Sequence, residues 1–398
     1  MDYGEQALKL HKRLQGKLET ASKVKIKNRQ DLSVVYTPGV AAVSSFIAQN
    51  PEAAFDLTLK GRTVAVISDG SAVLGLGNIG PEAALPVMEG KCLLFKIFAN
   101  LDAFPIVINT QDTKEIISFI RQIAPTFAAI NLEDISAPRC FEIENSLQNL
   151  GIPVMHDDQH ATAMAILGPL QAAVKLAKKN WFNLKVVISG AGAAGTTVAK
   201  MLSCHGFGNL YCSAVSDVIV IDRKGIIYKG RSDLEGYKKE LAYFTNKDAI
   251  RGDLEKALFG ADVFIGLSTG GILKAHYIKK MAADPIIFAL ANPIPEIIPD
   301  EARKAGVKFI ATGRSDFPNQ VNNALIFPGF FKGLLQARLK KITPEIKMKV
   351  SQALGQIIEN PTPENFVPSI FDARVVKAVS SAVRDYPKAG LNFDRDLH

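Results

Sequence analysis

Short apolar runs alternate with longer segments of helical periodicity through most of the chain. In the first half, the runs that predict strands are Thr63–Ser68, Cys92–Phe98, Pro105–Asn109, Ala128–Leu132 and Ile152–Met155. Between the last two, apolar residues recur at the spacing of one helix face, at Cys140, Ile143, Leu147 and Leu150. Alternating strands and helices of these lengths predict an α/β fold built on a parallel sheet.

A second alternating block begins near Leu184. A strand over Lys185–Ser189 is followed by a glycine-rich turn and by a helix that we expect to continue to about His205. Later strands are predicted over Val218–Ile221, Val263–Leu267, Ile286–Leu290 and Lys308–Ala311. The segment Ala161–Asn180 has the pattern of a helix that links the two blocks.

The chain becomes helical again after Gly329. Thr343 and Pro344 suit the N-cap and first positions of a helix. One face of that helix repeats apolar residues at Ile346, Val350, Leu354 and Ile357. We expect this C-terminal tail to pack back on the first block.

The turn after Lys185–Ser189 reads Gly190-Ala191-Gly192-Ala193-Ala194-Gly195. Because it follows a strand and opens a helix, it is a good dinucleotide-binding fingerprint. Gly190 allows the tight turn, Gly192 lets the backbone approach a pyrophosphate, and Gly195 allows close packing of helix on strand. The helix N-terminus stabilises the phosphate charge. A glycine-rich turn without a ligand is the alternative.

Asp222 ends the next predicted strand and is the candidate for the ribose contact. A carboxylate there accepts hydrogen bonds from a 2′-hydroxyl and repels a 2′-phosphate, which favours NAD. It lies 27 positions after Gly195, more than the usual spacing of about 20, so a loop is inserted before it. Arg223 and Lys224 follow directly and are able to hold a 2′-phosphate, so NADP remains open.

Two acidic pairs follow apolar runs in the first block. They are Glu133 with Asp134, and Asp157 with Asp158. Carboxylates at neighbouring strand ends suit a hard octahedral ion, Mg²⁺ or Mn²⁺, while one aspartate orients a proton-transfer group. The alternative is that these acids cap helices. The flanking His156 and His160 are more simply hydrogen-bonded histidines than ligands.

Composition and charge narrow the function classes. The 398 residues carry 47 Lys and Arg against 39 Asp and Glu, a formal net charge of +8. These cations are spread along the chain, so we expect attraction of small anions and no nucleic acid binding. No apolar run reaches the about 20 residues of a membrane helix. Four cysteines without a CxxC pair argue against a disulfide framework and favour a cytoplasmic protein.

Tyr36 and Lys91 are candidates by context. Tyr36 precedes a Pro-Gly turn that presents its hydroxyl, and Lys91 enters an apolar run, where burial lowers the pKa of an amine towards that of a useful base. A core tyrosine and a surface lysine are the alternatives.

Taken together, these motifs resemble the malic enzymes, specifically their short bacterial-type form. The matching blocks run in order from residue 33 to residue 329. They are Ser33–Ala41, Ser68–Gly80, Met88–Lys96, Asn131–Phe141, Ile152–Thr162, Gly190–Gly195, Ala289–Glu296 and Ala311–Gly329.

The resemblance implies an N-terminal malate- and metal-binding domain over residues 1–162 and a Rossmann-type NAD(P)-binding domain over 163–329. A helical segment over 330–398 then packs back on the first domain. The implied reaction is oxidative decarboxylation of (S)-malate to pyruvate and CO₂, with reduction of NAD, or of NADP, in the presence of Mg²⁺ or Mn²⁺.

The resemblance also implies a role for each candidate. Lys91 is the general base, Tyr36 protonates the enol carbon, and Asp157 supports Lys91. Glu133, Asp134 and Asp158 resemble the metal ligands. The residues implied for cofactor and substrate are Gly190, Gly192, Ala193, Ala194, Gly195, Asp222, Asn292 and Asn322, with Asn323 as the adjacent alternative to Asn322.

Several readings stay open within this resemblance. The long eukaryotic form has an arginine in the block that matches Gly70–Leu76, and this chain has none, so backbone amides of Gly75–Gly80 are the alternative contact for a substrate carboxylate. A malolactic-type or oxaloacetate decarboxylase on the same site, and a non-enzymatic nucleotide-sensing scaffold, are the competing functions. The family implies a homodimer or homotetramer, and a helix over Glu5–Leu18 is available for an interface.

Overall fold

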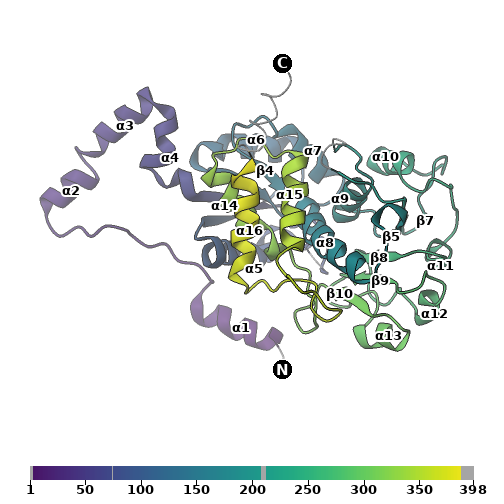
Figure 1. The fold of residues 1–398 in the computed structure, drawn as a ribbon. Coiled ribbons are helices and arrows are strands. Elements are labelled where there is room, and N and C mark those ends of the chain that lie inside the picture. The colour runs from purple at the N-terminus through teal and green to yellow at the C-terminus, as the bar shows by residue number, and fades with distance from the viewer. Residues whose placement is uncertain (1–2, 74, 208–211, 387–398) are drawn as a thin grey trace, which may run out of the picture.

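The computed structural model describes residues 3–73, 75–207 and 212–386. Two parallel-sheet domains lie side by side, and an N-terminal arm projects from the first of them (Figure 1). The α/β fold class predicted from the alternating pattern is confirmed.

The first domain contains a four-stranded parallel sheet in the order β2-β1-β3-β4. The strands are β1 (Thr63–Ser68), β2 (Asp102–Val107), β3 (Ala129–Leu132) and β4 (Val154–His156). The helices around them are α5 (Pro81–Leu94), α6 (Thr113–Ile123) and α7 (Arg139–Ser146). Both faces of β1 and β3 are buried, as continuous apolar runs in parallel sheets require. The acidic pairs therefore follow neighbouring strands at one edge of the sheet.

One predicted strand is wrong. Cys92–Phe98 ends α5 and continues as a further helical turn, η3 (Phe95–Ala99). An apolar run of this length fits a buried helix as well as a strand. Tertiary packing decides between them, because Phe95 contacts the rings of Phe327 and Phe331 at centroid distances of 4.7 and 5.3 Å.

The second domain has a six-stranded sheet in the order β10-β9-β8-β5-β6-β7, which is the Rossmann order. The strands are β5 (Lys185–Ser189), β6 (Asp217–Asp222), β7 (Gly225–Ile226), β8 (Val263–Gly266), β9 (Ile286–Ala289) and β10 (Phe309–Thr312). The helices are α9 (Ala193–Leu202), α10 (Gly236–Phe244), α11 (Leu254–Ala257), α12 (Ala275–Ile278) and α13 (Pro299–Lys304). Only β7 runs antiparallel among the described strands.

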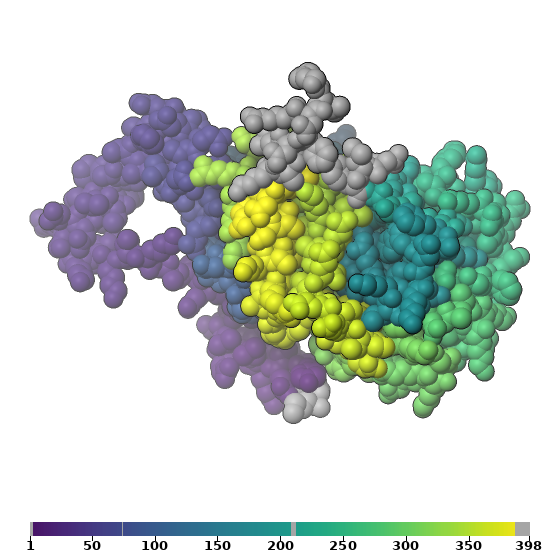
Figure 2. Space-filling model, in the orientation of Figure 1, coloured from purple at the N-terminus to yellow at the C-terminus, as the bar shows by residue number. Residues whose placement is uncertain are grey.

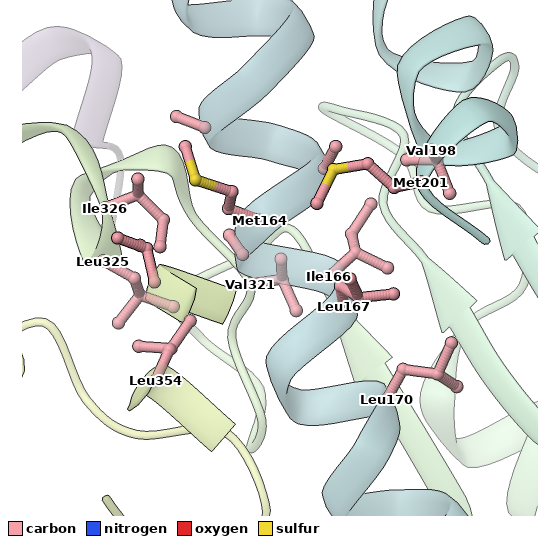
Figure 3. Close-up of a cluster of buried hydrophobic side chains, with 14 of the residues drawn as sticks. Met164, Ile166, Leu167, Leu170, Val198, Met201, Val321, Leu325, Ile326 and Leu354 are labelled. Atoms are coloured by element: carbon pink, nitrogen blue, oxygen red, sulfur yellow. The ribbon is translucent and has the colours of Figure 1, made fainter. Parts of the chain in front are cut away.

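The helix α8 (Asp157–Leu176) joins the two sheets and is buried along most of its length. Its apolar side chains contact α9 on one side and the C-terminal segment on the other (Figure 3). The C-terminal helices are α14 (Phe327–Gln336), α15 (Pro344–Gly355) and α16 (Ala373–Arg384). Helix α15 packs along α8, and a methyl group at Gly168 would overlap the Ser351 carbonyl oxygen, so the two helices are in close contact.

The cap predicted for α15 is confirmed. Thr343 is its N-cap and Pro344 its first residue, and the Thr343 side chain accepts a hydrogen bond from the backbone N–H of Ile346. Residues 387–398 of the predicted C-terminal segment lie outside the described residues.

The N-terminal arm contains α1 (Tyr3–Leu14), α2 (Arg29–Val35), α3 (Val40–Gln49) and α4 (Ala54–Leu57). In these described helices no residue is buried, and many apolar side chains face solvent. Figures 1 and 2 show α2 and α3 standing away from the body of the molecule. Among the residues that the structure describes, an extended apolar surface of the arm is therefore uncovered.

The arm also contains a segment, Arg29–Gln49, that is long and apolar enough to cross a membrane by length and composition. In the structure it is two helices of 7 and 10 residues, separated at Tyr36–Gly39. Each helix is shorter than the about 20 residues that a span needs.

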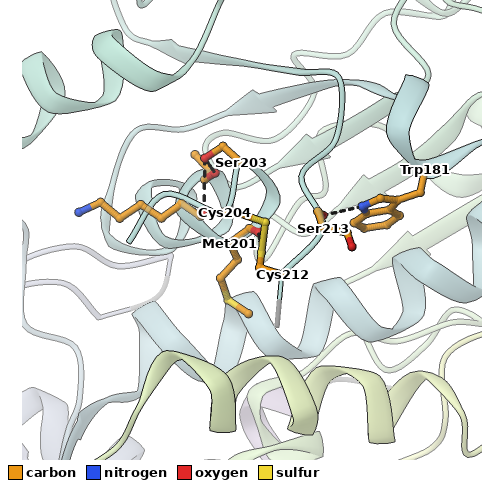
Figure 4. Close-up of a disulfide and its surroundings, with 8 residues drawn as sticks. Trp181, Met201, Ser203, Cys204, Cys212 and Ser213 are labelled. Atoms are coloured by element: carbon orange, nitrogen blue, oxygen red, sulfur yellow. Dashed lines mark hydrogen bonds between the residues drawn. A yellow bond between two sulfur atoms is a disulfide. The ribbon is translucent and has the colours of Figure 1, made fainter. Parts of the chain in front are cut away.

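A disulfide joins Cys204 and Cys212, whose Cα atoms are 5.7 Å apart (Figure 4). The expectation that the cysteines form no disulfide is wrong for this pair. Cys92 and Cys140 are buried free thiols, as expected. The bridge falls at the end of α9, where the sequence has its inserted loop before Asp222. The eight-residue separation carries no CxxC signal, so spacing alone did not predict it.

Candidate active site

A buried lysine lies among carboxylates at the edge where β3 and β4 end. Helix α5 carries Lys91 there, and its side chain is only 9% exposed. The Nζ atom is 2.6 Å from Asp157 Oδ2 and 2.8 Å from Glu133 Oε1. It also lies 4.1 Å from the centroid of the Phe327 ring. The fold thus brings together three residues that are far apart in the sequence.

The carboxylates form one cluster. Glu133, Asp157 and Asp158 each offer an oxygen, and these atoms all lie within 4.8 Å of one another. Asp134 joins through its backbone N–H, which donates to Asp158 Oδ2 at 2.9 Å. Helix capping, the alternative for these acids, therefore does not account for Glu133 and Asp157, whose side chains meet Lys91.

Two oxygens of this cluster indicate that a cation fits there. Asp134 Oδ2 and Asp157 Oδ1 are buried and have no hydrogen-bond partner among the residues that the structure describes. A buried anionic oxygen is unfavourable unless a cation or a donor compensates it. Since every donor atom is a carboxylate oxygen, Mg²⁺ or Mn²⁺ suits the site.

The charges are unbalanced without such an ion. Burial raises the pKa of Glu133 well above its usual value. Burial and repulsion from Asp158 raise the pKa of Asp134 to about 8. Burial alone would lower the pKa of Lys91, but the carboxylates of Asp157 and Glu133 outweigh it, and this pKa is raised. Burial therefore acts in the expected direction, and the two acids that contact the amine reverse the net shift.

Asn323 contacts the cluster. Its Nδ2 atom donates to Asp157 Oδ2 at 2.7 Å, and its Oδ1 atom accepts from the Thr162 hydroxyl at 3.2 Å. The oxygen of Asn322 instead accepts from the backbone N–H of Ala324 and caps the short helix η6 (Asn323–Leu325). Of the two asparagines left open by the sequence, Asn323 is the one that touches Asp157.

Glu144 is a buried acid that the sequence analysis missed. It accepts hydrogen bonds from the backbone N–H of His156 and from His160 Nε2, both at 2.9 Å. Burial opposes its ionisation, but His160 and Lys347 outweigh this and lower the pKa of Glu144 to about 2. This carboxylate therefore anchors the start of α8. Its position four residues after Cys140, on the predicted apolar face, was the available signal.

Tyr36 is not brought to this cluster. It follows α2 on the arm and is 66% exposed. Within the described ranges, no hydrogen bond joins it to Lys91 or to the acids. A single chain therefore does not complete the set of residues that the sequence analysis grouped together.

The glycine-rich turn lies between β5 and α9, as predicted. A methyl group at Gly195 would overlap the Gly190 carbonyl oxygen, whereas one at Gly192 would meet no atom within 4 Å. The N-terminus of α9 begins at Ala193, followed by Ala194. Gly195 therefore serves the packing of helix on strand, and Gly192 leaves open space beside the backbone.

Asp222 lies next to this turn at the end of β6. Strands β5 and β6 pair in parallel, and the Gly190 backbone N–H donates to the Ile221 carbonyl oxygen at 2.9 Å. The long sequence separation from Gly195 therefore leaves Asp222 at a strand end beside the glycine-rich turn. Its carboxylate contacts Arg231 and Lys238, two cations that the sequence analysis missed.

Asn292 follows β9 and faces the first domain. A methyl group at Gly75 would lie 2.9 Å from the Asn292 carbonyl oxygen. The glycine-rich stretch after β1 thus meets the carboxyl end of the second sheet, which is where α/β proteins bind their ligands.

The fold and the site together define a dehydrogenase-type protein, with a Rossmann domain beside a lysine–carboxylate centre. Residues 15–148 match the family model "Malic enzyme, N-terminal domain". Residues 159–386 match the model "Malic enzyme, NAD binding domain". The chain belongs to the malic enzyme family, as the resemblance implied.

Relatives cover nearly the whole chain. An NAD-dependent malic enzyme of Geobacillus stearothermophilus is 52% identical over 92% of this chain and 76% of its own length. A bifunctional malic/malolactic enzyme of Bacillus subtilis is 49% identical over 96% and 92%. The crystal structure of an NAD-dependent malic enzyme from Thermotoga maritima has 48% identity and a TM-score of 0.90, covering 95% of this chain and 98% of that one.

Substitution of Gly195 and of Gly192 should have different effects on stability and on dinucleotide binding. Gly195→Ala forces α9 away from β5 and should lower the free energy of unfolding by about 1–3 kcal/mol. Gly192→Ala should change it by less than about 0.5 kcal/mol, yet weaken dinucleotide binding at least about tenfold, because the methyl group occupies the space of a pyrophosphate. Urea denaturation and calorimetric titration measure the two effects. Equal effects of both variants on stability would contradict this assignment.

If the carboxylate cluster binds a divalent cation, the cation should raise the free energy of unfolding of the protein. At a free Mn²⁺ concentration 100-fold above its dissociation constant, the free energy of unfolding should rise by about 2.7 kcal/mol. Asp158→Asn should lose this gain while staying within about 1 kcal/mol of the wild type in EDTA. Denaturation with and without Mn²⁺ checks this. Glu142→Gln, an exposed acid on α7, is the control and should keep the gain, and a retained gain in Asp158→Asn would remove the cluster from consideration.

Proposed function

We propose that the chain catalyses metal-dependent oxidative decarboxylation of (S)-malate to pyruvate and CO₂, with reduction of NAD or NADP. The observation that carries the proposal is the buried Lys91 amine in contact with Glu133 and Asp157, in a chain of the malic enzyme family. The close relatives named NAD-dependent malic enzymes support it.

Lys91 is the proposed general base for the 2-hydroxyl of malate. Asp157 and Asn323 hold the amine and its carboxylate partner in place through short contacts. To accept a proton, the amine must first be neutral, and the acids around it oppose this. Compensation of their charge by a divalent cation removes that obstacle.

Glu133, Asp134 and Asp158 are the residues that would hold the ion. When bound, the cation supplies Lewis acidity beside Lys91, and the dinucleotide supplies the hydride acceptor. The unpartnered oxygen of Asp134 supports this assignment, and that of Asp157 adds a further carboxylate oxygen at the same place.

We assign a separate proposed role to each of the two sheet-containing domains. Residues 1–162 form the malate and metal domain, residues 163–329 the NAD(P) domain, and residues 330–398 a helical segment that packs back on the first. Gly190, Gly192, Ala193, Ala194, Gly195 and Asp222 receive the cofactor. Asn292 and Asn322 remain the proposed contacts of the substrate.

Tyr36 is the proposed acid that protonates the enol carbon, and its place on the arm indicates how it reaches a site. The arm exposes apolar side chains from α2 and α3 that a second copy of the chain would cover. We therefore propose a homodimer, alone or within a homotetramer, in which the arm carries Tyr36 to the Lys91 cluster of the partner. The exposure of the arm supports this assembly, as does the absence of a hydrogen bond between Tyr36 and the Lys91 cluster within the described ranges.

A malolactic or oxaloacetate decarboxylase reaction on the same site is the second candidate. The observation that favours the malolactic reaction is the 49% identity to the relative named a bifunctional malic/malolactic enzyme. The products separate the two: pyruvate with free reduced cofactor for the first function, and lactate without it for the second. We place either reaction in the cytoplasm, a reducing compartment in which the Cys204–Cys212 pair is expected as two thiols.

Lys91→Ala tests the reaction and the base together. The wild type should reduce NAD or NADP with malate and Mn²⁺, release pyruvate, and stop in EDTA. The variant should lose about 10²–10⁴-fold in kcat while its dissociation constant for the dinucleotide stays unchanged, because the glycine turn is untouched. Lys96→Ala, outside the cluster, should keep its activity. A wild type that binds the dinucleotide but does not reduce it with malate overturns the proposal.

Mixing two inactive variants tests the exchanged arm. A dimer of one Tyr36→Phe chain and one Lys91→Ala chain has one site with both native residues, so co-expression should restore about one quarter of the wild-type rate. Co-expressed Lys91→Ala and Asp158→Asn chains, whose changes affect the same cluster, should restore none. No recovery in the first mixture would mean that Tyr36 acts within its own chain or not at all.

A further inference from the structure

A cavity of about 440 Å³ lies where α7, α9, α10 and α15 meet. Its size is within the range of about 300–1,000 Å³ that small-molecule sites have. Its walls come from both sheet-containing domains and from the C-terminal helices (Figure 1). Among the described residues that line it are neither Lys91 and the carboxylate cluster nor Asp222 and Gly190–Gly195. The cavity is therefore distinct from the proposed malate and dinucleotide sites.

Thr196, on α9, places an unpartnered hydroxyl in the wall of this cavity. The residue is only 2% exposed, and its Oγ1 atom has no hydrogen-bond partner among the residues that the structure describes. The neighbouring Thr197 instead donates its hydroxyl to the Ala193 carbonyl oxygen of the same helix. A buried hydroxyl without a partner is unfavourable. An acceptor atom of a ligand in the cavity would supply the partner that Thr196 lacks.

Lys347, on α15, brings a positive charge to the same cavity. Its Nζ atom lies 3.1 Å from His160 Nδ1 and 3.3 Å from His160 Nε2. Because Nε2 donates to Glu144, only Nδ1 is free to accept a hydrogen bond from the ammonium group. An ammonium group has three donors, so two remain for a ligand in the part of the chain that the structure describes. Burial lowers the pKa of Lys347 although Glu144 opposes this, so the charge of the amine is not fully compensated.

The two acids that line the cavity have donors of their own. Glu144 accepts hydrogen bonds from a backbone N–H, from a histidine and from a glutamine. Glu240 contacts Lys200 Nζ at 2.9 Å and His205 Nε2 at 3.2 Å. Their repulsion of an incoming anion is therefore offset, and Lys347 is the lining cation whose recorded partner within the described ranges carries no charge.

Much of the remaining wall is apolar. The rings of Phe141 and Tyr237 lie with their centroids 4.9 Å apart, and Val154, Ile342 and Pro344 also line the cavity. An apolar wall with a few polar groups is typical of a site for a small organic ligand. A ligand that fits these groups combines an anionic group with an aromatic or other apolar body.

We propose that this cavity binds a small organic anion, a carboxylate attached to an aromatic body, with Lys347 and Thr196 donating to the carboxylate. The apolar body lies against the rings of Phe141 and Tyr237. The inference does not depend on the proposed function, because the cavity shares no residue with the sites of that reaction among the described residues.

Binding of para-fluorobenzoate to the purified full chain tests the inference, and fluorine NMR detects it. The wild type should bind this probe with a dissociation constant of about 1 mM, as expected for so few ligand atoms. The neutral analogue para-fluorobenzamide should bind at least about tenfold more weakly, because it lacks the charge that Lys347 recognises. Malate with Mn²⁺, added without dinucleotide, should not displace the probe.

Two variants test the residues separately. Lys347→Met should weaken binding of the probe about tenfold. Thr196→Val keeps the shape of the side chain and should weaken binding about fivefold, yet unfold at or above the wild-type midpoint, because the hydroxyl that it removes has no partner. Lys349→Met is the matched control, since Lys349 lies on α15 over the Tyr386 ring and does not line the cavity, and it should bind the probe as the wild type does.

Four outcomes overturn the inference. They are a wild type that does not bind the probe, equal binding of the acid and the amide, displacement of the probe by malate, and unchanged binding in both Lys347→Met and Thr196→Val. Displacement by malate would place the probe in the proposed active site and leave the proposed function intact. Loss of binding in Lys349→Met to the same extent as in Lys347→Met would show that only the overall charge of α15 matters, which also overturns it.

Discussion

The structure depends on an excess of buried negative charge around one lysine. Four acids gather where β3 and β4 end, and Lys91 is the cation that contacts two of them. An arrangement of this kind is unfavourable in an isolated fold, because each buried carboxylate loses hydration that one amine does not replace. A site built in this way is suited to a divalent cation and to a base whose proton affinity depends on that cation. Apolar contacts elsewhere along α5 and α8, which carry Lys91 and Asp157, offset the cost of burying these charges.

The exposed arm and the Lys91 cluster are connected through the proposed role of Tyr36. Within the described residues, Tyr36 makes no hydrogen bond to the Lys91 cluster, and the arm that carries it stands away from the body with its apolar side chains exposed. In the proposed dimer, a second copy would bury the apolar helices and supply the phenol. In the proposed assembly, folding, association and catalysis would depend on the same contact, and the oligomer would be part of the active site.

Much of the fold was predictable from local pattern, whereas the exceptions came from tertiary contacts. Continuous apolar runs predicted β1, β3 and β5, because buried parallel strands have that pattern. The convergence of Glu133 with Asp157 followed from the rule that parallel strands end at one edge. Cys92–Phe98 was misjudged because the Phe327 and Phe331 rings, distant in sequence, favour a helix there. The partners of Asp222, the Cys204–Cys212 bridge and the contact of Asn323 with Asp157 depend on spatial neighbours that no periodicity encodes.

The packing of Phe95 on Phe327 has a consequence for the order in which the chain is made. Synthesis delivers the first sheet long before α14 and α16 exist, and η3 lies against both of these helices. Until they emerge from the ribosome, one wall of the first core faces water. Contacts between the two ends of a chain form slowly, and such partly covered intermediates are prone to aggregate. The first domain of a nascent chain is therefore expected to be most prone to aggregation before α14 and α16 emerge.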